Sequence, residues 1–294
     1  MKYHLPYIIN LPPFMFRGEN TDDYGLLKKF TFILKGKFLG LMIKKLNEKN
    51  FCMLLNLFYR EESKIYFEDG KYKKNLEKTG TISYPNKRIL RMVNNYELQL
   101  NKIILTYCLD TIEFNDNDTI IDCGANVGEL NIALKNKNIN VNYIAFEPDL
   151  ETFECLKLNN HGQNNKFFQK ALSDKNEVQE FFLDSDGGNS SLSQFVNNQS
   201  SIEVECSTLD SLNLDTYIKL FKIDAEGYEP EVIKGALTTL EKVKYISVDF
   251  GHEKGFDEEA TLTDVNKILY DKGYELIKFS DYRLIGLYEN KNFK

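Results

Sequence analysis

The sequence contains few cysteines and no excess of positive charge, and each shortage excludes a class of protein. Five cysteines occur in 294 residues, far apart and without a C-x-x-C pair. This pattern excludes a disulfide framework and a zinc knuckle, and it suits a reducing compartment, so we expect a cytoplasmic protein. The formal net charge of −7 argues against a general nucleic-acid-binding protein, because neutralising phosphate groups requires a basic face.

Long apolar runs are also missing. No uninterrupted stretch is long enough to span a bilayer, and Pro6, Pro12 and Pro13 interrupt the first apolar residues, so we expect neither a transmembrane segment nor a signal peptide. Hydrophobic residues still make up 42% of the chain, which is enough for a sizeable core. The length of the chain suits one main domain with a smaller appendage. A turn signal near Tyr84-Pro85 predicts an N-terminal appendage of mixed, partly helical structure over residues 1–84 and a main domain over 85–294.

The appendage contains one helical pattern that is rich in lysine. Across residues 26–46, apolar residues recur at helical spacing and lysines fill the other positions. Such a basic amphipathic helix can make peripheral contact with an anionic membrane surface. We favour the alternative that its apolar side packs against the main domain or a second subunit of a homodimer, because Gly36 and Gly40 weaken the helix. Residues 65–72 then predict a hairpin around Asp69-Gly70.

After Gly128, strand and helix patterns alternate, which is typical of an α/β protein with a parallel sheet covered by helices. A polar loop at 184–201 is long for a compact domain, and its Asn189, Ser190 and Ser191 could bind a polyol acceptor. We expect strands near 120–122, 143–146, 166–169, 178–183, 202–206, 218–223, 245–250, 275–279 and 284–288, and helices near 94–109, 127–136, 150–159, 230–240 and 262–272.

The segment from Ile120 to Gly128 predicts a buried strand that ends in an acid, then a glycine turn and the start of a helix. Gly124 and Gly128 have no Cβ, so the backbone can pass close to a ligand. Asp122 stands where dinucleotide-binding enzymes have their first glycine, which suits a ligand with an amino group better than a pyrophosphate. The N–H groups near Asn126 and Gly128 could bind a carboxylate. The pattern resembles the first motif of S-adenosylmethionine-dependent methyltransferases, although such turns also occur for structural reasons.

A second acidic residue follows the next predicted strand. Glu147, just before Pro148, lies roughly 20 residues beyond the glycine turn. An acid at this offset, on the tip of a neighbouring strand, is placed to accept hydrogen bonds from both ribose hydroxyls of a nucleoside. Because a purely structural turn does not need this carboxylate, Asp122 and Glu147 together indicate a donor site more specifically than the glycines alone.

The following strand leads to a short segment where an adenine ring would lie. Leu172 could line the ring, and Ser173 or Asp174 could meet its exocyclic amine. An ordinary turn explains these three residues equally well.

The strand at 218–223 ends in Asp224-Ala225-Glu226-Gly227, which puts two carboxylates at the carboxyl edge of the sheet. Lys222 precedes Asp224 by two positions and should point to the same face, where we expect it to pair with a buried carboxylate. With the glycine turn, Phe146-Glu147-Pro148 and residues 208–212, this segment resembles the FkbM family of methyltransferases, from about residue 95 to residue 288. The resemblance implies a Rossmann-like class I methyltransferase, with a mostly parallel seven-stranded sheet flanked by helices.

The same resemblance implies transfer of a methyl group from S-adenosylmethionine to a hydroxyl. An alcohol is a poor nucleophile, so attack requires the reacting atoms about 3 Å apart and a group that takes up the alcohol proton. Asp224 is our first candidate as the base or as an organiser of the donor site, Glu226 is the second, and His252 is an alternative base. Asp224 and Asp249 could also bind Mg²⁺ through their carboxylates. An equally good interpretation is that Asp249 and His252 only shape the acceptor pocket.

These observations predict an O-methyltransferase that acts on a carbohydrate hydroxyl, in a surface glycan or its nucleotide-linked precursor. The acceptor class follows from the resemblance alone. One alternative is methylation of an amine or of another small metabolite. A different alternative is a non-catalytic scaffold protein that binds a nucleoside, and the intact Asp122, Glu147, Asp224 and Glu226 count against it.

Overall fold

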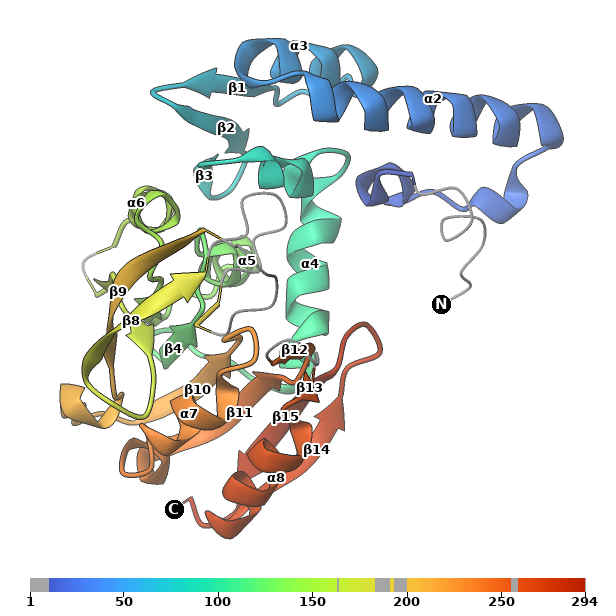
Figure 1. Ribbon diagram of the computed structural model, residues 1–294. Helices are drawn as coiled ribbons and strands as arrows, with labels where there is room; N and C mark the ends of the chain where they lie inside the picture. The colour runs from blue at the N-terminus through green and yellow to red at the C-terminus, as the bar shows by residue number, and fades with distance from the viewer. Residues whose placement is uncertain (1–10, 163, 183–190, 193–199, 255–258, 294) are drawn as a thin grey trace. The chain divides into compact units, whose positions relative to one another are not determined.

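The computed structural model describes residues 11–162, 164–182, 191–192, 200–254 and 259–293. The chain forms two compact units, Met1–Gln99 and Leu100–Lys294 (Figure 1). This division lies later than the boundary expected after residue 84. The reason is that the 3-10 helix η3 (Lys87–Met92) packs against strands β2 (Lys71–Leu76) and β3 (Gly80–Tyr84), and so belongs with them. Within the ranges described, no helix is both long enough and apolar enough to cross a membrane.

The first unit combines two helices with a small antiparallel sheet. Two short 3-10 helices, η1 (Pro13–Phe16) and η2 (Thr21–Asp23), precede α2 (Leu26–Lys45) and α3 (Glu48–Phe58). Strands β1 (Ile65–Glu68) and β2 form a hairpin, and β3 pairs with the other edge of β2. Asp69 (φ 50°) and Gly70 (φ 72°) both have positive φ, as a turn that matches the strand twist requires. The predicted hairpin is confirmed.

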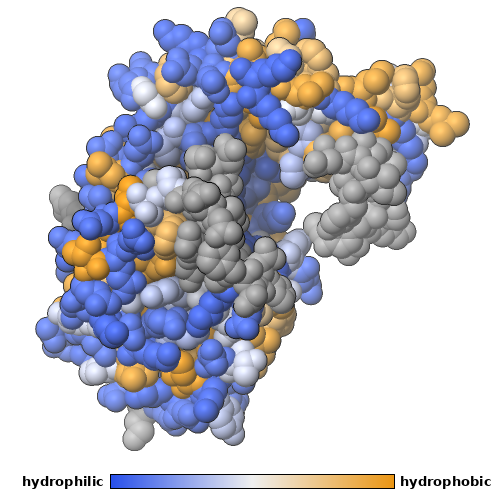
Figure 2. All heavy atoms as spheres, in the orientation of Figure 1, coloured by the Kyte–Doolittle hydropathy of each residue, from blue (hydrophilic) through white to orange (hydrophobic). Residues whose placement is uncertain are grey.

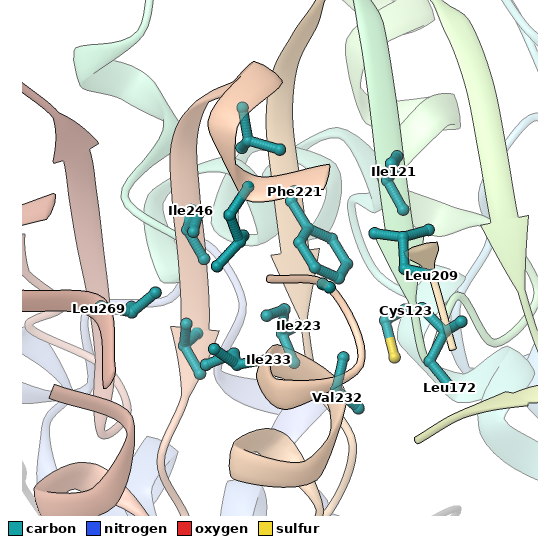
Figure 3. Packing of buried hydrophobic residues seen from close by; sticks show 14 of the residues in the cluster. Ile121, Cys123, Leu172, Leu209, Phe221, Ile223, Val232, Ile233, Ile246 and Leu269 are labelled. Carbon is teal, nitrogen blue, oxygen red and sulfur yellow. The ribbon is translucent and has the colours of Figure 1, made fainter. Parts of the chain in front are cut away.

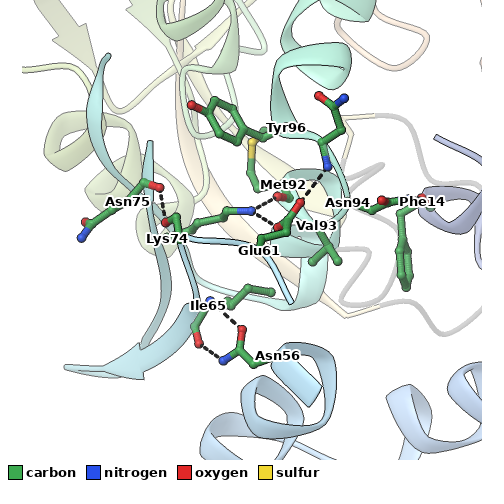
Figure 4. Close-up of polar contacts among 12 residues, drawn as sticks. Phe14, Asn56, Glu61, Ile65, Lys74, Asn75, Met92, Val93, Asn94 and Tyr96 are labelled. Atoms are coloured by element: carbon green, nitrogen blue, oxygen red, sulfur yellow. Dashed lines mark hydrogen bonds and ion pairs between the residues drawn. The ribbon is translucent and has the colours of Figure 1, made fainter. Parts of the chain in front are cut away.

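A buried lysine joins the hairpin to the chain that follows it (Figure 4). The ammonium of Lys74 forms an ion pair with Glu61 and donates to the carbonyl of Met92 at 2.7 Å. The side-chain amide of Asn56 exchanges two hydrogen bonds with the backbone of Ile65, at 2.7 and 3.0 Å. These polar contacts connect α3, β1, β2 and η3, which explains further why the unit extends past residue 84.

The second unit is an α/β structure around a seven-stranded sheet with the order β14-β15-β11-β10-β4-β5-β6. The strands from β11 to β6 run parallel, and β15 is antiparallel to both of its neighbours. The strands of this sheet are β4 (Thr119–Cys123), β5 (Asn142–Phe146), β6 (Lys166–Phe168), β10 (Ile218–Ile223), β11 (Val243–Asp249), β14 (Tyr274–Phe279) and β15 (Ile285–Asn290). The helices are α4 (Tyr96–Thr106), in which the division between the units falls, α5 (Glu129–Asn136), α6 (Leu150–Asn159), α7 (Glu229–Lys234) and α8 (Leu262–Asp271).

The strand order reverses beside β4. The chain passes from β4 outward through β5 and β6, then returns to β10 on the opposite side of β4. Ligands of open α/β sheets bind beyond the carboxyl ends of the strands at such a point. The predicted α/β fold with a mostly parallel seven-stranded sheet is confirmed, and the order identifies the edge at which a site is expected.

Alternate residues of the central strands face opposite sides of this sheet. On one side, Ile121 and Cys123 of β4 and Phe221 and Ile223 of β10 join side chains of α7 and α8 in a buried apolar cluster (Figure 3). The intervening residues therefore point to the other side, where Asp122 and Lys222 face each other as cross-strand partners. The apolar cluster packs against one side of the sheet, and the opposite side of the sheet carries the charged groups.

The remaining elements of the second unit are small. They are a three-stranded sheet in the order β7-β9-β8, formed by β7 (Ala171–Leu172), β8 (Glu177–Phe182) and β9 (Ser201–Ser207), the pair β12 (His252–Lys254) and β13 (Glu259–Ala260), and 3-10 helices at Leu109–Thr111, Asp210–Leu212 and Thr239–Lys242. Strands as short as β7 have no alternating pattern that a sequence could reveal. The helix expected at 230–240 ends at Lys234. The next residue must be glycine, because a Cβ at Gly235 would lie 2.0 Å from the Ser173 carbonyl oxygen.

Candidate functional site

The glycine turn after β4 is packed against the protein itself. Gly124 (φ 69°) and Gly128 (φ 81°) both have left-handed backbone conformations. A Cβ at Gly124 would lie 2.0 Å from the carbonyl oxygen of Asp224, and a Cβ at Gly128 would lie 1.9 Å from the Nδ2 of Asn160. The space that a side chain would occupy is thus filled at Gly124 by the loop after β10 and at Gly128 by Asn160. A contact between either glycine and a ligand stays a prediction.

Glu147 follows β5 and is bonded to the glycine turn. Its buried carboxylate accepts the N–H of Asn126 at 2.9 Å and the N–H of Asp149 at 3.1 Å. The N–H of Ala125 donates to the Phe146 carbonyl at 3.0 Å, so two hydrogen bonds join the ends of β4 and β5. A carboxylate has about four acceptor positions, so these contacts are compatible with hydrogen bonds from the hydroxyls of a ribose.

The N–H groups expected to bind a ligand carboxylate have partners inside the turn. The N–H of Asn126 donates to Glu147, and the N–H of Gly128 donates to the Ala125 carbonyl at 2.8 Å. Asn126 has a φ of 50°, a conformation that asparagine adopts more readily than most residues. These two N–H groups shape the turn, and binding of a ligand carboxylate by N–H groups of this segment stays a prediction.

Asp122 lies in the core of the second unit and faces Lys222. The carboxylate is 2.9 Å from the ammonium of Lys222, and the hydroxyl of Tyr143 donates to its other oxygen. Burial alone would lower the pKa of Lys222, but Asp122, Tyr107 and Asp224 together outweigh burial and raise it. The expected pairing of Lys222 with a buried carboxylate is confirmed. Asp122 is buried and already paired, so its predicted contact with the amino group of a ligand gains no support from this arrangement and stays a prediction.

Asp224 directly follows β10 and is held from two sides. The hydroxyl of Tyr107 donates to its Oδ2, and the Nζ of Lys222 lies 3.9 Å from the same oxygen, while 13% of the Asp224 side chain remains exposed. Burial, and after it the charge of Asp224, raises the pKa of Tyr107, so the phenol stays a donor. The N–H of Asp224 donates to the Cys123 carbonyl at 3.2 Å. Backbone hydrogen bonds therefore connect the ends of β5, β4 and β10, and they bring Glu147 and Asp224 to one edge of the sheet.

Glu229 anchors the loop that carries Asp224. Its Oε1 accepts the N–H groups of Ala225 and Gly227 at 3.1 and 3.0 Å, and its Oε2 accepts the hydroxyl of Thr261 at 2.8 Å. Burial raises the pKa of Glu229 to about 7. The loop needs this anchor because Glu226 (φ 49°) and Gly227 (φ 98°) both have positive φ.

Two predicted acceptor-side elements are described only in part. Of the loop at 184–201, Ser191 is buried, and its hydroxyl donates to the Glu226 carbonyl at 2.6 Å. Asn189 and Ser190 lie outside the described residues. The backbone of His252 begins β12, but its side chain also lies outside them. A Ser191 contact to a polyol and a base role for His252 therefore stay predictions.

The residues expected around adenine have the contacts of an ordinary turn. Leu172 belongs to the apolar cluster (Figure 3). Ser173 is buried, and its N–H donates to the Ser207 carbonyl at 3.0 Å. The Ser173 hydroxyl lies 3.3 Å from the exposed Asp174 carboxylate. Pro148 is buried next to Glu147. A role in donor binding for any of these residues stays a prediction.

Asp249 ends β11 in an ion pair. Its Oδ2 lies 2.9 Å from the guanidinium of Arg283, and its Oδ1 accepts the N–H of Gly251 at 3.2 Å. Asp224 already has Lys222 beside it, and a divalent cation would be repelled by both cationic side chains. Across the described ranges, no cluster of three or more His, Cys, Asp or Glu side chains could hold a metal ion. The expected Mg²⁺ site at Asp224 and Asp249 does not fit this geometry.

Tyr107, Tyr143 and Arg283 were missed by the sequence analysis. A signal existed for Tyr143, because it alternates with Ala145, which is the cross-strand partner of Asp122. Tyr107 follows α4, and Arg283 lies between β14 and β15. Neither residue has a local pattern that relates it to a carboxylate more than 30 residues away in the chain.

The residues at this edge of the sheet fall within a segment that has known relatives. Residues 122–276, just over half of the chain, match the family described as "Methyltransferase FkbM domain". The matching segment includes the glycine turn, Glu147 and the Asp224 loop. Curated proteins gave no match to the chain.

Solved structures align with the chain at low similarity. TrmK of M. capricolum in complex with S-adenosyl-homocysteine is 10% identical with a TM-score of 0.40, and the alignment covers 66% of this chain and 69% of that one. A SAM dependent methyltransferase from Aquifex aeolicus is 14% identical with a TM-score of 0.39, over 66% of this chain and 97% of that one. At such identities and TM-scores, we rest no argument on either match.

Proposed function

Because the chain belongs to the FkbM family of S-adenosylmethionine-dependent methyltransferases, we propose that its acceptor is a hydroxyl group of a carbohydrate. The family and the sheet order identify the Rossmann-like class I fold. The acceptor is a surface glycan or its nucleotide-linked precursor, and this class is suggested by the resemblance of the motifs. The choice of a hydroxyl has additional support from the site.

The observation that carries the proposal is the placement of Asp224. Its carboxylate lies at the end of β10, beside the glycine turn, and 13% of the side chain is exposed. Tyr107 donates a hydrogen bond to it, and Lys222 lies close to the same oxygen. Bound S-adenosylmethionine supplies a methyl group on a sulfonium, which needs no activation, whereas an alcohol must lose its proton during attack. A carboxylate at this edge can accept that proton. Lys222 and the Tyr107 hydroxyl hold this carboxylate in position at the end of β10.

Glu147 is the residue that we propose for the donor ribose. It is fixed at the end of β5 by the N–H groups of Asn126 and Asp149, so its carboxylate does not have to be ordered by the ligand. Two hydroxyls on adjacent carbons present two donors to one carboxylate, and hydrogen bonds to a charged group are roughly twice as strong as neutral ones. The donor would then lie across the ends of β4 and β5, next to Asp224.

Calorimetric titration with S-adenosylhomocysteine tests the donor site. We expect micromolar binding to the wild type, and binding at least about tenfold weaker to Glu147→Gln, because hydrogen bonds to a charged group contribute about 1.5–3 kcal/mol. Glu151→Gln, which changes an exposed carboxylate on α6, is the matched control and should bind normally. If the folded wild type does not bind, the assignment of the donor site fails.

The acceptor is tested separately, with donor labelled on the methyl group. Monosaccharides, nucleotide-linked sugars and oligosaccharides are compared with a matched set of amines. Transfer to a sugar hydroxyl supports the proposal. Transfer to amines alone contradicts it, and so does donor binding without transfer to any carbohydrate, which would leave a binding protein without turnover.

A further inference from the structure

Helix α2 carries apolar side chains on two opposite faces. On its inner face, Leu39 is buried, and Gly36 lies so close to Leu11 that a Cβ would approach the Leu11 Cδ2 to 2.7 Å. The opposite face, which we call the outer face of α2, presents large apolar side chains with exposed fractions from 46% to 89%: Leu26, Leu27, Phe30, Leu34, Phe38 and Leu41. The expectation of a single apolar side is therefore wrong.

The outer face is a continuous apolar surface. Figure 2 shows hydrophobic side chains gathered over α2 and continuing toward α3. The rings of Phe38 on α2 and Phe58 on α3 lie 5.8 Å apart, and Met53 and Leu57 of α3 are also exposed. An exposed apolar patch of this kind marks an interaction site.

The charge of α2 indicates what covers this surface. Its sequence, LLKKFTFILKGKFLGLMIKK, has six lysines and no acidic residue, whereas the whole chain has a net charge of −7. Lys37, Lys44 and Lys45 are exposed and, at 100° per residue, fall on the side of the helix that carries the outer face. Lys28 and Lys35 instead lie over the rings of Tyr24 and Tyr59, at 3.7 and 4.5 Å.

We infer that the outer face of α2 binds the surface of an anionic membrane, with the helix lying in the plane of the interface. Exposed leucine and phenylalanine side chains beside lysines are what such a helix needs, since the former enter the boundary of the acyl chains and the latter meet the headgroups. A second copy of the chain fits less well. A symmetric pairing through this face would place two helices without acidic residues side by side, and their like charges would repel.

Flotation of the full-length protein with vesicles tests the inference. We expect the wild type to float with vesicles of phosphatidylcholine and phosphatidylserine and to float much less with phosphatidylcholine alone. Lys44→Gln/Lys45→Gln should weaken the binding about thirtyfold, because each lysine near an anionic surface contributes about a fivefold effect. Lys175→Gln/Lys267→Gln, which removes two exposed lysines of the second unit, is the matched control and should bind as the wild type does.

The apolar contribution is tested with Leu34→Ser/Phe38→Ser, which should weaken binding at least tenfold. The matched control is Leu158→Ser/Leu276→Ser, which changes two leucines of the second unit with similar exposure, 44% and 45%. Circular dichroism and thermal unfolding establish that each variant is folded.

Three outcomes would overturn the inference. One is no flotation of the wild type with anionic vesicles, and another is equal flotation with uncharged ones. The third is a wild-type dimer in sedimentation equilibrium that dissociates in Leu34→Ser/Phe38→Ser, because the outer face would then be an interface between two copies of the chain.

Discussion

The ammonium of Lys222 lies 2.9 Å from the carboxylate of Asp122 on the neighbouring strand, and both side chains are buried. Lys222 also donates to the carbonyls of Gly124, at 2.8 Å, and Cys123, at 3.2 Å. The pair therefore neutralises two charges in the core and holds the glycine turn against β10. Such a pair adds little net stability, but loss of one partner leaves an uncompensated charge.

Replacing Lys222 by methionine should lower the free energy of unfolding by about 3–5 kcal/mol, because Asp122 would remain buried without its cation. Urea denaturation measures the loss. Lys219→Met is the control on the same strand. Lys219 lies 3.9 Å from Asp118, and both side chains reach solvent, with 12% and 15% exposed, so we expect a clearly smaller loss. Similar losses for the two variants would contradict a structural role for the buried pair.

Replacing Asp224 by asparagine should lower kcat by a factor of about 10² to 10⁴, the usual contribution of a positioned base. Tyr107→Phe removes only the hydrogen bond that orients Asp224, so we expect a smaller fall in kcat, of about tenfold. Both variants should bind S-adenosylhomocysteine nearly as tightly as the wild type. Tyr270→Phe, at an exposed tyrosine, is the control. Normal turnover by Asp224→Asn would exclude it as the base.

Glu229 should make stability depend on pH. Burial raises the pKa of Glu229 from 4.5 to about 7, so between these values the folded state keeps a proton that the unfolded state has released. The folded state therefore loses stability as the pH rises from about 4.5 to about 7, by on the order of 3 kcal/mol.

The measurement is urea unfolding of the wild type and Glu229→Gln across this pH range. The variant cannot titrate at this position, so the difference between the two proteins isolates the contribution of Glu229. As the pH rises, the wild type should lose stability relative to the variant. A difference that is constant with pH would show that Glu229 has an ordinary pKa.

Gly124→Ala should destabilise the second unit and weaken donor binding, because its Cβ would have to displace the Asp224 carbonyl oxygen from a position 2.0 Å away. The matched control is Gly273→Ala. Its φ of 84° resembles the 69° of Gly124, but its Cβ would meet the exposed side chain of Asn292, which can move. We expect about 1–2 kcal/mol for Gly273→Ala, from the backbone conformation alone, and clearly more for Gly124→Ala. Equal effects in thermal unfolding would refute the steric argument.

Removing divalent cations should leave methyl transfer unchanged. Asp249 pairs with Arg283 at 2.9 Å, and Asp224 has Lys222 beside it, so neither carboxylate is placed for Mg²⁺. Turnover is compared with and without a chelator at a fixed donor concentration. Activity that disappears with the chelator and returns with added Mg²⁺ would restore the metal hypothesis.

The parts of the fold that could be predicted are those with strong local patterns. The apolar strand before Asp122, the acid Glu147 at the next strand end and the charged loop after Ile223 are all legible, because a buried strand followed by a polar residue at its tip leaves a period-two signal. The pairing of Lys222 was also predictable from alternation along one strand.

The rest depends on contacts between distant segments. Nothing near Tyr107 indicates that it donates to Asp224, and nothing near Gly124 shows that the Asp224 carbonyl fills the space beside it. Helix α2 was misjudged for a different reason. Its apolar residues are so numerous that two faces overlap in the sequence pattern, and only the packing of Leu11 against Gly36 separates them.

The hydrogen bonds between the ends of β4, β5, β6 and β10 have a consequence for the entropy of binding. Ala125 donates to Phe146, Glu147 donates to Phe168 and Asp224 donates to Cys123, so each strand end is linked to its neighbour by the backbone. The conformational freedom of these loops is lost when the chain folds, before any ligand arrives. A nucleoside at this edge therefore meets a preorganised surface, and little of its interaction free energy is consumed in ordering the protein.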